Sequence, residues 1–591
     1  MAAVLVVVSS ISSRSWFALA AWARHDPCCK HIRPAGRGAM KTMAVDGDRD
    51  EHRTLISLWY RQRVRPSLER LARARAVVVW PLALIAGVAT GYAILAFRFG
   101  IGVVQSLWLG VAEENIVATK AGFTHPLIVF AAPVIGGLVV GLMLIRLAPK
   151  RRAEGVADVI ETAHLRRGRI DWRSGLASAL ITTVSLGAGA SAGREGPAVH
   201  IGATLAGLAT RWLKMPLASR RALLAAGAAA AVAASFNAPI AGVIFAHEVI
   251  LGHYALTAFV PAVLAAVAAT IVTRVHLGDY PAFILPDFAI ASLWEMPAFA
   301  LLGVVSGLVA ALFLFCAALA EKGAQRMVVP LWLRPLLGGV VIGAMAAFLP
   351  QILGVGYEVT NLALRGRYDF GFLLLLLVAK MIATAVTLAS RFGGGVFSPS
   401  LFLGAMTGAA FGVVAAGLAP EGASAQGTYA LIGTGAVAGA VLGAPLSTAL
   451  IVFEMTGDYK MTLALLMATA LASVTAQVLA AKSFFHWQLA GRGLDLEEGP
   501  HKRILHTVRV RDFMEPREKG ASTEVPEPYD ERPQLARDDT LRKVLRALDE
   551  GNYMKLAVVD ANGRLGGWVT RTAAMEAYNR ELVATSVEEH R

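Results

Sequence analysis

Two adjacent ionisable residues, Arg194 and Glu195, stand in an otherwise apolar stretch, in Gly193-Arg194-Glu195-Gly196-Pro197. Ionisable side chains in a membrane segment are costly when lipid surrounds them, so a cavity or the protein interior must receive them. The alternative is a buried structural pair, but neighbouring residues on a helix do not face each other. An ionised Glu195 would occupy an anion site, and a protonated Glu195 would leave it. We therefore expect Glu195 to gate an anion path.

A second glycine-rich segment, Gly393 to Pro399, also places flexible backbone before a proline and an apolar run. Both segments predict a helix N-terminus inside the membrane, because proline is tolerated in the first turn and glycine permits the bend before it. Two converging N-termini would present free N–H groups and positive dipole ends to an anion. Binding by dipoles is weak enough to let the ion leave again.

The elements that carry these segments show an internal repeat. Two stretches share glycine, proline and glutamate at the same offsets: Gly227, Pro239 and Glu248 in the first, and Gly433, Pro445 and Glu454 in the second. Upstream, Pro197 precedes Gly202 by five residues, and Pro399 precedes Gly404 by five. Transporters are often built from such repeats, although membrane helices rich in alanine, glycine and proline also resemble each other by composition. Spacing alone does not separate parallel from inverted repeats.

Composition places this chain in a membrane. Of its 591 residues, 56% are hydrophobic and 17% charged, and the mean hydropathy is +0.56. We count about a dozen apolar runs near the roughly 20-residue spanning length. They include Val77 to Phe97, Pro126 to Leu147, Ala255 to Val272 and Phe370 to Leu388. The 57 glycines fit closely packed and interrupted helices.

The net charge of +14 could suggest a nucleic-acid partner, but the basic clusters flank apolar spans. We therefore expect no nucleic-acid partner. Six arginines precede the first span and predict a cytoplasmic N-terminus: Arg61, Arg63, Arg65, Arg70, Arg73 and Arg75. Residues 1–75 are expected to be a partly disordered cytoplasmic leader, in which Met40 or Met43 begins a more ordinary sequence.

Enzyme and metal chemistry are not indicated. Cys28, Cys29 and Cys316 have neither disulfide nor metal-site spacing and are expected to be unpaired thiols. The chain has no HExxH, GxSxG or paired-aspartate motif in its spans. We therefore expect no catalytic residue, no bound metal and no cofactor.

The motifs resemble those of the CLC chloride channels and proton/chloride antiporters. Gly193 to Pro197 matches the GREGP signature, Gly395 to Pro399 matches GxFxP, and Phe236 to Gly242 is similar to a third segment of that family. The resemblance implies an all-α polytopic membrane protein, an inverted-repeat bundle with broken helices. It covers residues 76–491, with repeats at about 76–253 and 290–480.

By this resemblance the protein is a homodimer in the lipid bilayer, with one anion path per subunit. Glu195 is then the gating glutamate, and Gly193, Arg194 and Gly196 belong to the anion-binding segment. The backbone amides that follow Gly395, those of Val396 and Phe397, cradle the anion. The resemblance also implies a multi-pass protein of the plasma (inner) membrane with both termini cytoplasmic.

Two side chains that tune anion choice in the family are altered. Its serine signature aligns with Ala153 to Ala157, where Glu154 replaces the serine and would repel an anion if it pointed inward. The family tyrosine aligns with Phe485, which keeps the ring and loses the hydroxyl. Chloride is the family default, with nitrate and other anions left open. The fluoride-exporting branch fits less well because Pro197 closes the motif.

Proton coupling is the second open point. The family's inner proton-relay glutamate aligns with Val249, which cannot carry a proton, and Glu248 points about 100 degrees away around the helix. This favours a voltage-gated-type chloride channel, and the alternative is a proton-coupled antiporter with a non-standard inner proton path. His200 and His247 could shuttle protons, although a lone histidine in a membrane segment is more often a packed or hydrogen-bonded residue.

Residues 492–591 form a polar tail, which is expected to be cytoplasmic. A Pro/Glu-rich linker is predicted from Glu515 to Pro533, followed by helix, strand, turn, strand and helix from Thr540 to Tyr578. This resembles a single CBS module, with Val508 to Met514 like the opening of one. Such modules normally occur in pairs, so pairing across a dimer is expected. Adenine-nucleotide binding is not expected, because Thr570 to Ala573 lacks the acidic residue that contacts the ribose in such modules.

Overall fold

The computed structural model describes residues 76–590, apart from gaps at 166–167, 169, 214, 279–289, 291, 421, 495–503, 518–521, 523 and 528. The expectations for residues 1–75, including the leader, Cys28, Cys29 and the arginines from Arg61 to Arg75, lie outside the described residues. Within the described part of the chain, nine helices are long and apolar enough to cross a membrane. Two shorter apolar helical stretches, Pro239–Leu251 and Pro445–Thr456, accompany them. The predicted helical membrane fold is confirmed.

The first half of the membrane region begins with a helix of 34 residues that contains Pro81. Its elements are α5 (Ala76–Leu109), η3 (Glu114–Ile116), α6 (Val117–Phe123), α7 (Pro126–Arg146), α8 (Val156–His164), α9 (Trp172–Gly187), α10 (Glu195–Trp212), α11 (Leu217–Phe236), α12 (Pro239–Phe245), the π-helical η4 (Ala246–Leu251) and α13 (Leu256–Leu277).

The second half begins with another long helix. Its elements are η5 (Leu293–Glu295), α14 (Met296–Arg326), η6 (Leu331–Leu333), α15 (Arg334–Phe348), η7 (Pro350–Ile352), α16 (Tyr357–Leu364), α17 (Phe370–Ala389), α18 (Phe397–Leu418), α19 (Gln426–Leu442), α20 (Pro445–Thr456), α21 (Tyr459–Ala480) and α22 (Phe484–Ala490).

The glycines of the repeat lie where helices cross without side chains between them. A Cβ on Gly202 of α10 would overlap the carbonyl oxygen of Gly227 in α11, and the reverse is also true. In the second half, Gly404 of α18 and Gly433 of α19 block each other in the same way. The matched glycines therefore mark two equivalent backbone-to-backbone crossings, which only the smallest residue permits.

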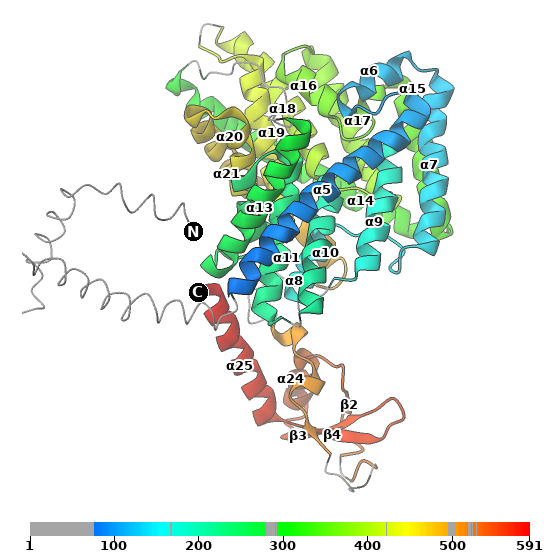
Figure 1. Ribbon diagram of the computed structural model, residues 1–591, viewed down its shortest axis with the longest axis vertical. Coiled ribbons are helices and arrows are strands. Elements are labelled where there is room, and N and C mark those ends of the chain that lie inside the picture. The colour runs from blue at the N-terminus through cyan, green and yellow to red at the C-terminus, as the bar shows by residue number, and fades with distance from the viewer. Residues whose placement is uncertain are drawn as a thin grey trace, which may run out of the picture. The chain divides into compact units, whose positions relative to one another are not determined.

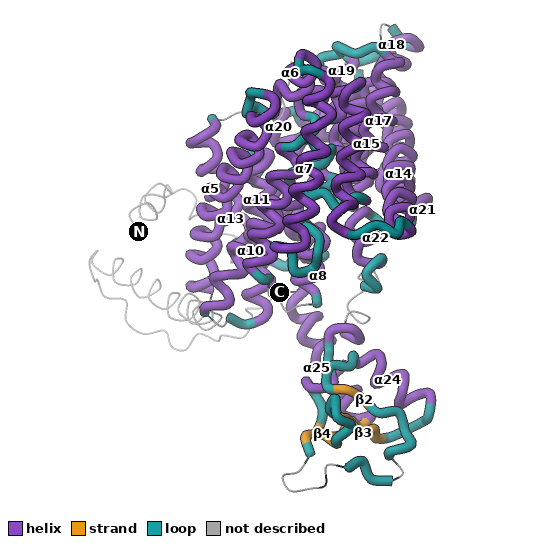
Figure 2. Tube along the Cα trace, turned by 90° about the vertical axis from the view of Figure 1, so that its right-hand side faces the viewer, coloured by secondary structure: helices purple, strands orange, loops and turns teal. Residues whose placement is uncertain are grey.

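The two halves run in opposite directions through the bundle. Helices α10 and α18 both begin at an antiparallel bridge between Gly193 and Gly395. From there α10 runs toward the end of the bundle that carries α8, while α18 runs toward the end that carries α6 (Figures 1 and 2). The repeat is therefore inverted, which the offsets alone did not decide.

The glutamates of the repeat cap the helices of the opposite half. Glu248, in η4, accepts hydrogen bonds from the backbone N–H groups of Leu446 (3.0 Å) and Ser447 (2.8 Å) at the start of α20. Glu454, in α20, accepts them from Ile240 (2.9 Å) and Ala241 (2.7 Å) at the start of α12. Each carboxylate satisfies N–H groups that a helix start leaves unpaired and also complements the helix dipole.

The tail contains a small α/β unit with a core of its own. Its elements are η8 (Val510–Asp512), β1 (Glu515–Pro516), β2 (Leu535–Ala536), α24 (Leu541–Glu550), β3 (Lys555–Val559), β4 (Leu565–Thr570) and α25 (Arg571–His590). The strand order is β1-β4-β3-β2, with β2 parallel to β3 and the other pairs antiparallel.

Helix, strand, turn, strand and helix thus follow each other in the tail as predicted. In the turn, the Asp560 carboxylate accepts hydrogen bonds from the N–H groups of Arg564 (3.0 Å) and Asn562 (2.8 Å), which lower the pKa of Asp560. The predicted linker is corrected at its start, because Glu515 and Pro516 form β1 by pairing with Trp568 and Gly567 in β4.

Candidate anion site

The starts of α10 and α18 are joined by their own backbone. The N–H group of Gly193 donates to the carbonyl of Gly395, and the N–H group of Gly395 donates to the carbonyl of Gly193, each at 2.7 Å. A Cβ on Gly196 would lie 3.3 Å from the Cα of Gly395, so the two segments touch. The amides of Gly193 and Gly395 are therefore used by the bridge. The N–H groups that follow them, in the first turn of each helix, have no acceptor within their own helix.

The Glu195 carboxylate lies beside the start of α18 and is 1% exposed. A Cβ on Gly193 would lie 2.8 Å from Oε2 of Glu195 and 2.9 Å from the backbone nitrogen of Ser398, so both atoms border the same small space. Oε2 has no hydrogen-bond partner among the residues that the structure describes. The carboxylate thus stands where the end of the α18 dipole favours a negative charge.

Tyr357, at the start of α16, holds the other carboxylate oxygen. Its hydroxyl donates to Oε1 of Glu195 at 2.7 Å, and the hydroxyl of Ser398 in α18 lies 3.5 Å from the same phenol oxygen. A hydrogen bond to a carboxylate is stronger than one between neutral groups. Tyr357 therefore stabilises Glu195 in its position between the two helix starts.

Arg194 is buried next to this carboxylate and is paired elsewhere. Its guanidinium forms an ion pair with Glu114 of η3 and lies over the ring of Tyr357, 4.9 Å from the centroid. Its Nε is 3.8 Å from Oε1 of Glu195, so the two neighbours do approach each other. The prediction that these neighbours do not face each other was wrong, because Arg194 precedes the first helical residue and the spacing of side chains on a helix does not apply to it.

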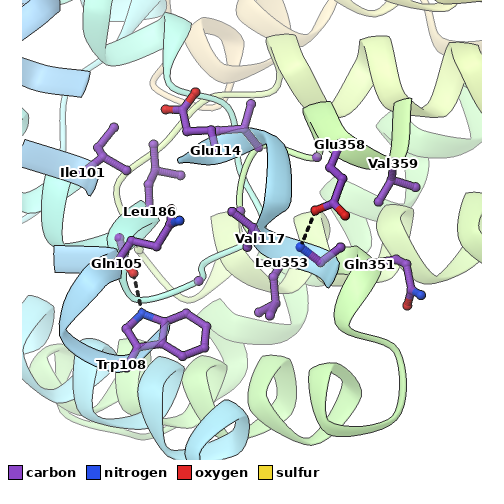
Figure 3. A pocket seen from close by; sticks show the side chains of 16 residues that line it. Ile101, Gln105, Trp108, Glu114, Val117, Leu186, Gln351, Leu353, Glu358 and Val359 are labelled. Atoms are coloured by element: carbon purple, nitrogen blue, oxygen red, sulfur yellow. Dashed lines mark hydrogen bonds between the residues drawn. The ribbon is translucent and has the colours of Figure 1, made fainter. Parts of the chain in front are cut away.

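A cavity of about 20 Å³ is lined by Glu114, the partner of Arg194, and by Gln105 and Trp108 of α5 (Figure 3). Gly354, Val355 and Gly356, which precede Tyr357, are part of its lining. The nearby Glu358 accepts hydrogen bonds from the N–H groups of Ala118 (2.7 Å) and Thr119 (3.0 Å) in α6. The carboxylate of Glu358 thereby ties α16 to α6.

A second cavity, of about 60 Å³, reaches the helix starts from the other end of the bundle. Gly196, Gly395, Val396, Phe397 and Phe485 all line it, which brings together most of the residues predicted to bind the anion. Farther along, its wall includes Arg152, Asp158 and Arg492. Helices α8 and α22 contribute to it, and both lie at the end of the bundle opposite α6 (Figure 2).

Glu154 is part of the wall of this second cavity, and its carboxylate is held by two basic side chains. It lies 2.7 Å from Nζ of Lys150 and 3.0 Å from Nε2 of His200 in α10. The backbone N–H of Glu154 donates to the hydroxyl of Ser178 at 2.9 Å. The expected repulsion of an anion is therefore offset locally by Lys150.

Position 249 offers no proton carrier. Val249 is buried in the π-helical segment η4, which packs against α8 and α11. The adjacent Glu248 is used as the cap of α20, and Nδ1 of His247 lies 2.9 Å from the carbonyl oxygen of Val243. Single-turn π segments often occur at functional positions, but here the carboxylate of η4 is committed to packing two halves together.

Three residues at the site were missed by the sequence reasoning: Glu114, Tyr357 and Lys380. Lys380 is buried in α17 and donates to the carbonyl oxygens of Ile352 (2.9 Å) and Gly354 (2.8 Å), in the segment that leads to Tyr357. A lysine inside the apolar run Phe370 to Leu388 was a signal that could have been used. Tyr357 and Glu114 carry no comparable local signal.

Comparison with known proteins agrees with this geometry. The model of the voltage gated chloride channel family matches residues 136–477. A "Putative chloride channel protein ClcB-like" of Ralstonia nicotianae is 34% identical over 416 residues, covering 69% of this chain and 96% of the relative. The "H(+)/Cl(-) exchange transporter ClcA" of Salmonella agona is 30% identical over 449 residues, covering 74% of this chain and 93% of the relative.

Two solved structures share the fold. A slow cyanobacterial Cl-/H+ antiporter superposes with a TM-score of 0.63 at 25% identity, covering 70% of this chain and 97% of its own. A eukaryotic CLC transporter superposes with a TM-score of 0.61 at 21% identity, covering 86% of this chain and 89% of its own, which shows the fold alone. With its inverted halves, its bridged helix starts and the match over more than half of its length, the chain belongs to the voltage gated chloride channel (CLC) family.

Proposed function

We propose that this protein moves chloride across the membrane through a path at the starts of α10 and α18, with Glu195 as its gate. The observation that carries the proposal is the position of the Glu195 carboxylate, which lies beside the start of α18 and has one oxygen without a partner in the described part of the chain. An ionised carboxylate and an anion compete for the same dipoles. Protonation removes that competition and lets the anion enter.

The residues around the gate have separable roles in this proposal. Gly193 and Gly395 join the two helix starts, and Arg194 positions Tyr357 and compensates buried negative charge. The backbone N–H groups of Gly196, Val396 and Phe397 bind the anion. Phe485 forms part of the wall without a donor, so selectivity for chloride rests on backbone dipoles.

A passive channel is the mechanism we propose, because position 249 is a valine and Glu248 is committed to capping α20. A proton-coupled exchanger is the second candidate. It is favoured by the 30% identity to a protein named as a proton/chloride exchange transporter. In an exchanger, protons cross the membrane in the direction opposite to chloride. In a channel, chloride crosses without protons.

Reconstitution in liposomes separates these mechanisms. Chloride efflux and internal pH are recorded together for the wild type and for Glu195→Gln. A channel gives chloride flux without proton movement, whereas an exchanger drives protons uphill with a chloride gradient. Glu195→Gln, which mimics the protonated gate, should keep chloride flux and abolish any proton movement. If neither protein releases chloride above empty liposomes, the proposed function is wrong.

We also propose a homodimer in the plasma (inner) membrane, with both termini cytoplasmic. Helices α12 and α20 pack together, and Ile240 and Leu446 at their starts are exposed apolar residues available to a second copy. Light scattering of the detergent-solubilised protein would measure the mass of the complex.

For the tail we propose a CBS-like module that pairs across the dimer and binds no adenine nucleotide. Thr570 is used locally, since its hydroxyl accepts from the N–H of Ala573 at 3.2 Å and thereby caps α25. Arg571 pairs with Asp549 at 3.1 Å. Titration of the full-length protein with ATP should release no measurable heat of binding.

A further inference from the structure

Glu154 and His200 form a buried acid–base pair that has no role in the proposed gating by Glu195. The carboxylate lies 3.0 Å from Nε2 of the imidazole, and His200 is 1% exposed. The pair joins the segment before α8 to the second turn of α10, and Lys150, which is partly exposed, adds a third member at 2.7 Å. A chain of polar groups therefore leads from the protein surface to a buried histidine.

One ring nitrogen of His200 forms no hydrogen bond with the described residues. Nδ1 is buried and has no hydrogen-bond partner among the described residues. With Nε2–H donating to Glu154, the neutral imidazole presents a lone pair at Nδ1, and a proton from water binds there to give the imidazolium. The charge of the Glu154–His200 pair then changes from −1 to 0. No other bond changes, and the proton is returned to water on release.

This change of charge occurs close to the cavity in which we propose that the anion binds. Glu154 is part of the wall of the same cavity as Val396 and Phe397, and His200 follows Glu195 by five residues on α10. Lys150 already offsets the charge of Glu154, so a proton on His200 adds one positive charge beside the cavity, which favours an anion there. Because the surroundings are buried, solvent screens this effect less than it would at a surface.

We propose that Glu154 and His200 form a proton-binding site whose protonation is linked to anion binding in the cavity. The proposal rests on the proposed anion path. By linkage, whatever factor protonation adds to anion affinity, anion binding adds to proton affinity. A bound anion would then favour a bound proton at this pair, and the linkage needs no carboxylate at position 249.

Other charged groups near the pair are already compensated. Asp158 is paired with Arg152 (2.8 Å) and Arg492 (3.1 Å), and Glu161 with Arg492 (3.2 Å). The other helices packed against α10 bring few titratable groups: α18 has none, α9 has the exposed Arg173, α11 has Arg220 and Arg221 at its start, and α5 has Tyr92 and Arg98. Helix α8 also has His164 in its last turn, which is partly buried and does not line the cavity. Glu154 in the wall and its partner His200 are therefore the acid–base pair that we expect to respond to pH next to the anion.

Chloride binding to the full-length protein in detergent tests the proposal. All measurements use the Glu195→Gln background, which removes titration of the gate. Calorimetry at pH 5.5 and pH 8 should show chloride affinity falling by about tenfold as the pH rises, within the usual range of coupling between sites. In a weakly buffered solution at intermediate pH, added chloride should raise the pH as protons are taken up.

His200→Gln should make chloride affinity independent of pH and abolish the proton uptake. Glu154→Gln is the second variant, and it should reduce both effects because a neutral amide no longer favours the imidazolium. His247→Gln is the matched control. His247 is also 1% exposed and has one ring nitrogen without a partner in the described residues. Unlike His200, which is bonded to Glu154 in the cavity wall, His247 contacts Val243, Tyr254 and Phe259, which do not line the cavity.

The outcomes separate the two proposals. If chloride binds in the Glu195→Gln background with the same affinity at both pH values, the proton site is refuted and the anion path stands. The proton site is also refuted if His247→Gln removes the pH dependence and His200→Gln retains it. If none of the variants binds or transports chloride, the anion path itself fails.

Discussion

At the scale of single residues, the gate depends on a hydroxyl that comes from neither signature segment. Glu195 and Ser398 belong to the two helix starts, while Tyr357 approaches both from α16. Lys380 holds the backbone just before α16, and Arg194 lies over the tyrosine ring. The position of the gating carboxylate is thus determined by contacts between three segments that are distant in sequence.

Removing this hydroxyl should make the gate leave the anion site more readily. Tyr357→Phe deletes the 2.7 Å hydrogen bond to Glu195 and changes little else in volume. A bond to a charged group contributes about 1.5–3 kcal/mol, part of which water will replace. We expect chloride efflux from liposomes at neutral pH to rise about tenfold, equivalent to about 1.4 kcal/mol.

Tyr429→Phe is the matched control for this change. Tyr429 is also buried and donates to a carboxylate, that of Glu295, at 2.8 Å, but it does not contact the gate. Its loss should leave efflux unchanged. In the Glu195→Gln background, Tyr357→Phe should likewise have no effect. An unchanged efflux for Tyr357→Phe in the wild-type background would show that the hydroxyl does not restrain the gate.

At the scale of helices, the matched residues of the repeat connect the two halves, because each half caps a helix of the other. Glu248 caps α20 and Glu454 caps α12, and the matched glycines allow α10 to cross α11 and α18 to cross α19. A helix start buried without such a partner would leave several N–H groups unsatisfied. The matched glutamates are therefore expected to contribute to stability more than to proton transfer.

Glu248→Ala should destabilise the protein by about 1–3 kcal/mol, because it leaves the N–H groups of Leu446 and Ser447 without their acceptor. Thermal unfolding in detergent measures the change. Glu321→Ala, which loses a partly exposed ion pair with Arg391 and an exposed hydrogen bond from Gln325, is the control and should cost less than about 1 kcal/mol. Chloride flux per folded Glu248→Gln molecule should equal that of the wild type. A selective loss of proton movement in that variant would instead make Glu248 a relay.

Helix starts and repeats were predictable because they depend on local residues. Pro197 and Pro399 lie in the first turns of α10 and α18, as their sequence context indicated. The direction of the second half was predictable from the family resemblance but not from the spacing of the repeat. The roles of Tyr357, Glu114 and Glu248 were not predictable, since each depends on which segments meet in space. The partner of Arg194 could not be found from spacing for the same reason: Glu114 lies 80 residues away.

At the scale of the whole chain, the tail and the membrane region have separate hydrophobic cores. The core of the tail is formed by residues between Ile504 and Leu582. Within the described residues, the membrane cores extend no farther along the chain than Leu494. Arg492, which pairs with Asp158 and Glu161, belongs to the membrane region in this division. Helix α22, which brings Phe485 to the anion cavity, belongs to it as well.

A protein that ends at Leu494 should therefore fold in detergent and keep its chloride flux, because every residue of the anion path is retained. The measurement is efflux per reconstituted molecule, together with the elution profile of the purified protein. A protein that ends at Lys482 is the control, since it also loses Phe485 and the ion pairs of Arg492 and should lose the flux. If ending the chain at Leu494 abolishes flux while the protein remains folded, the tail takes part in transport. In that case the separate cores do not mean separate functions.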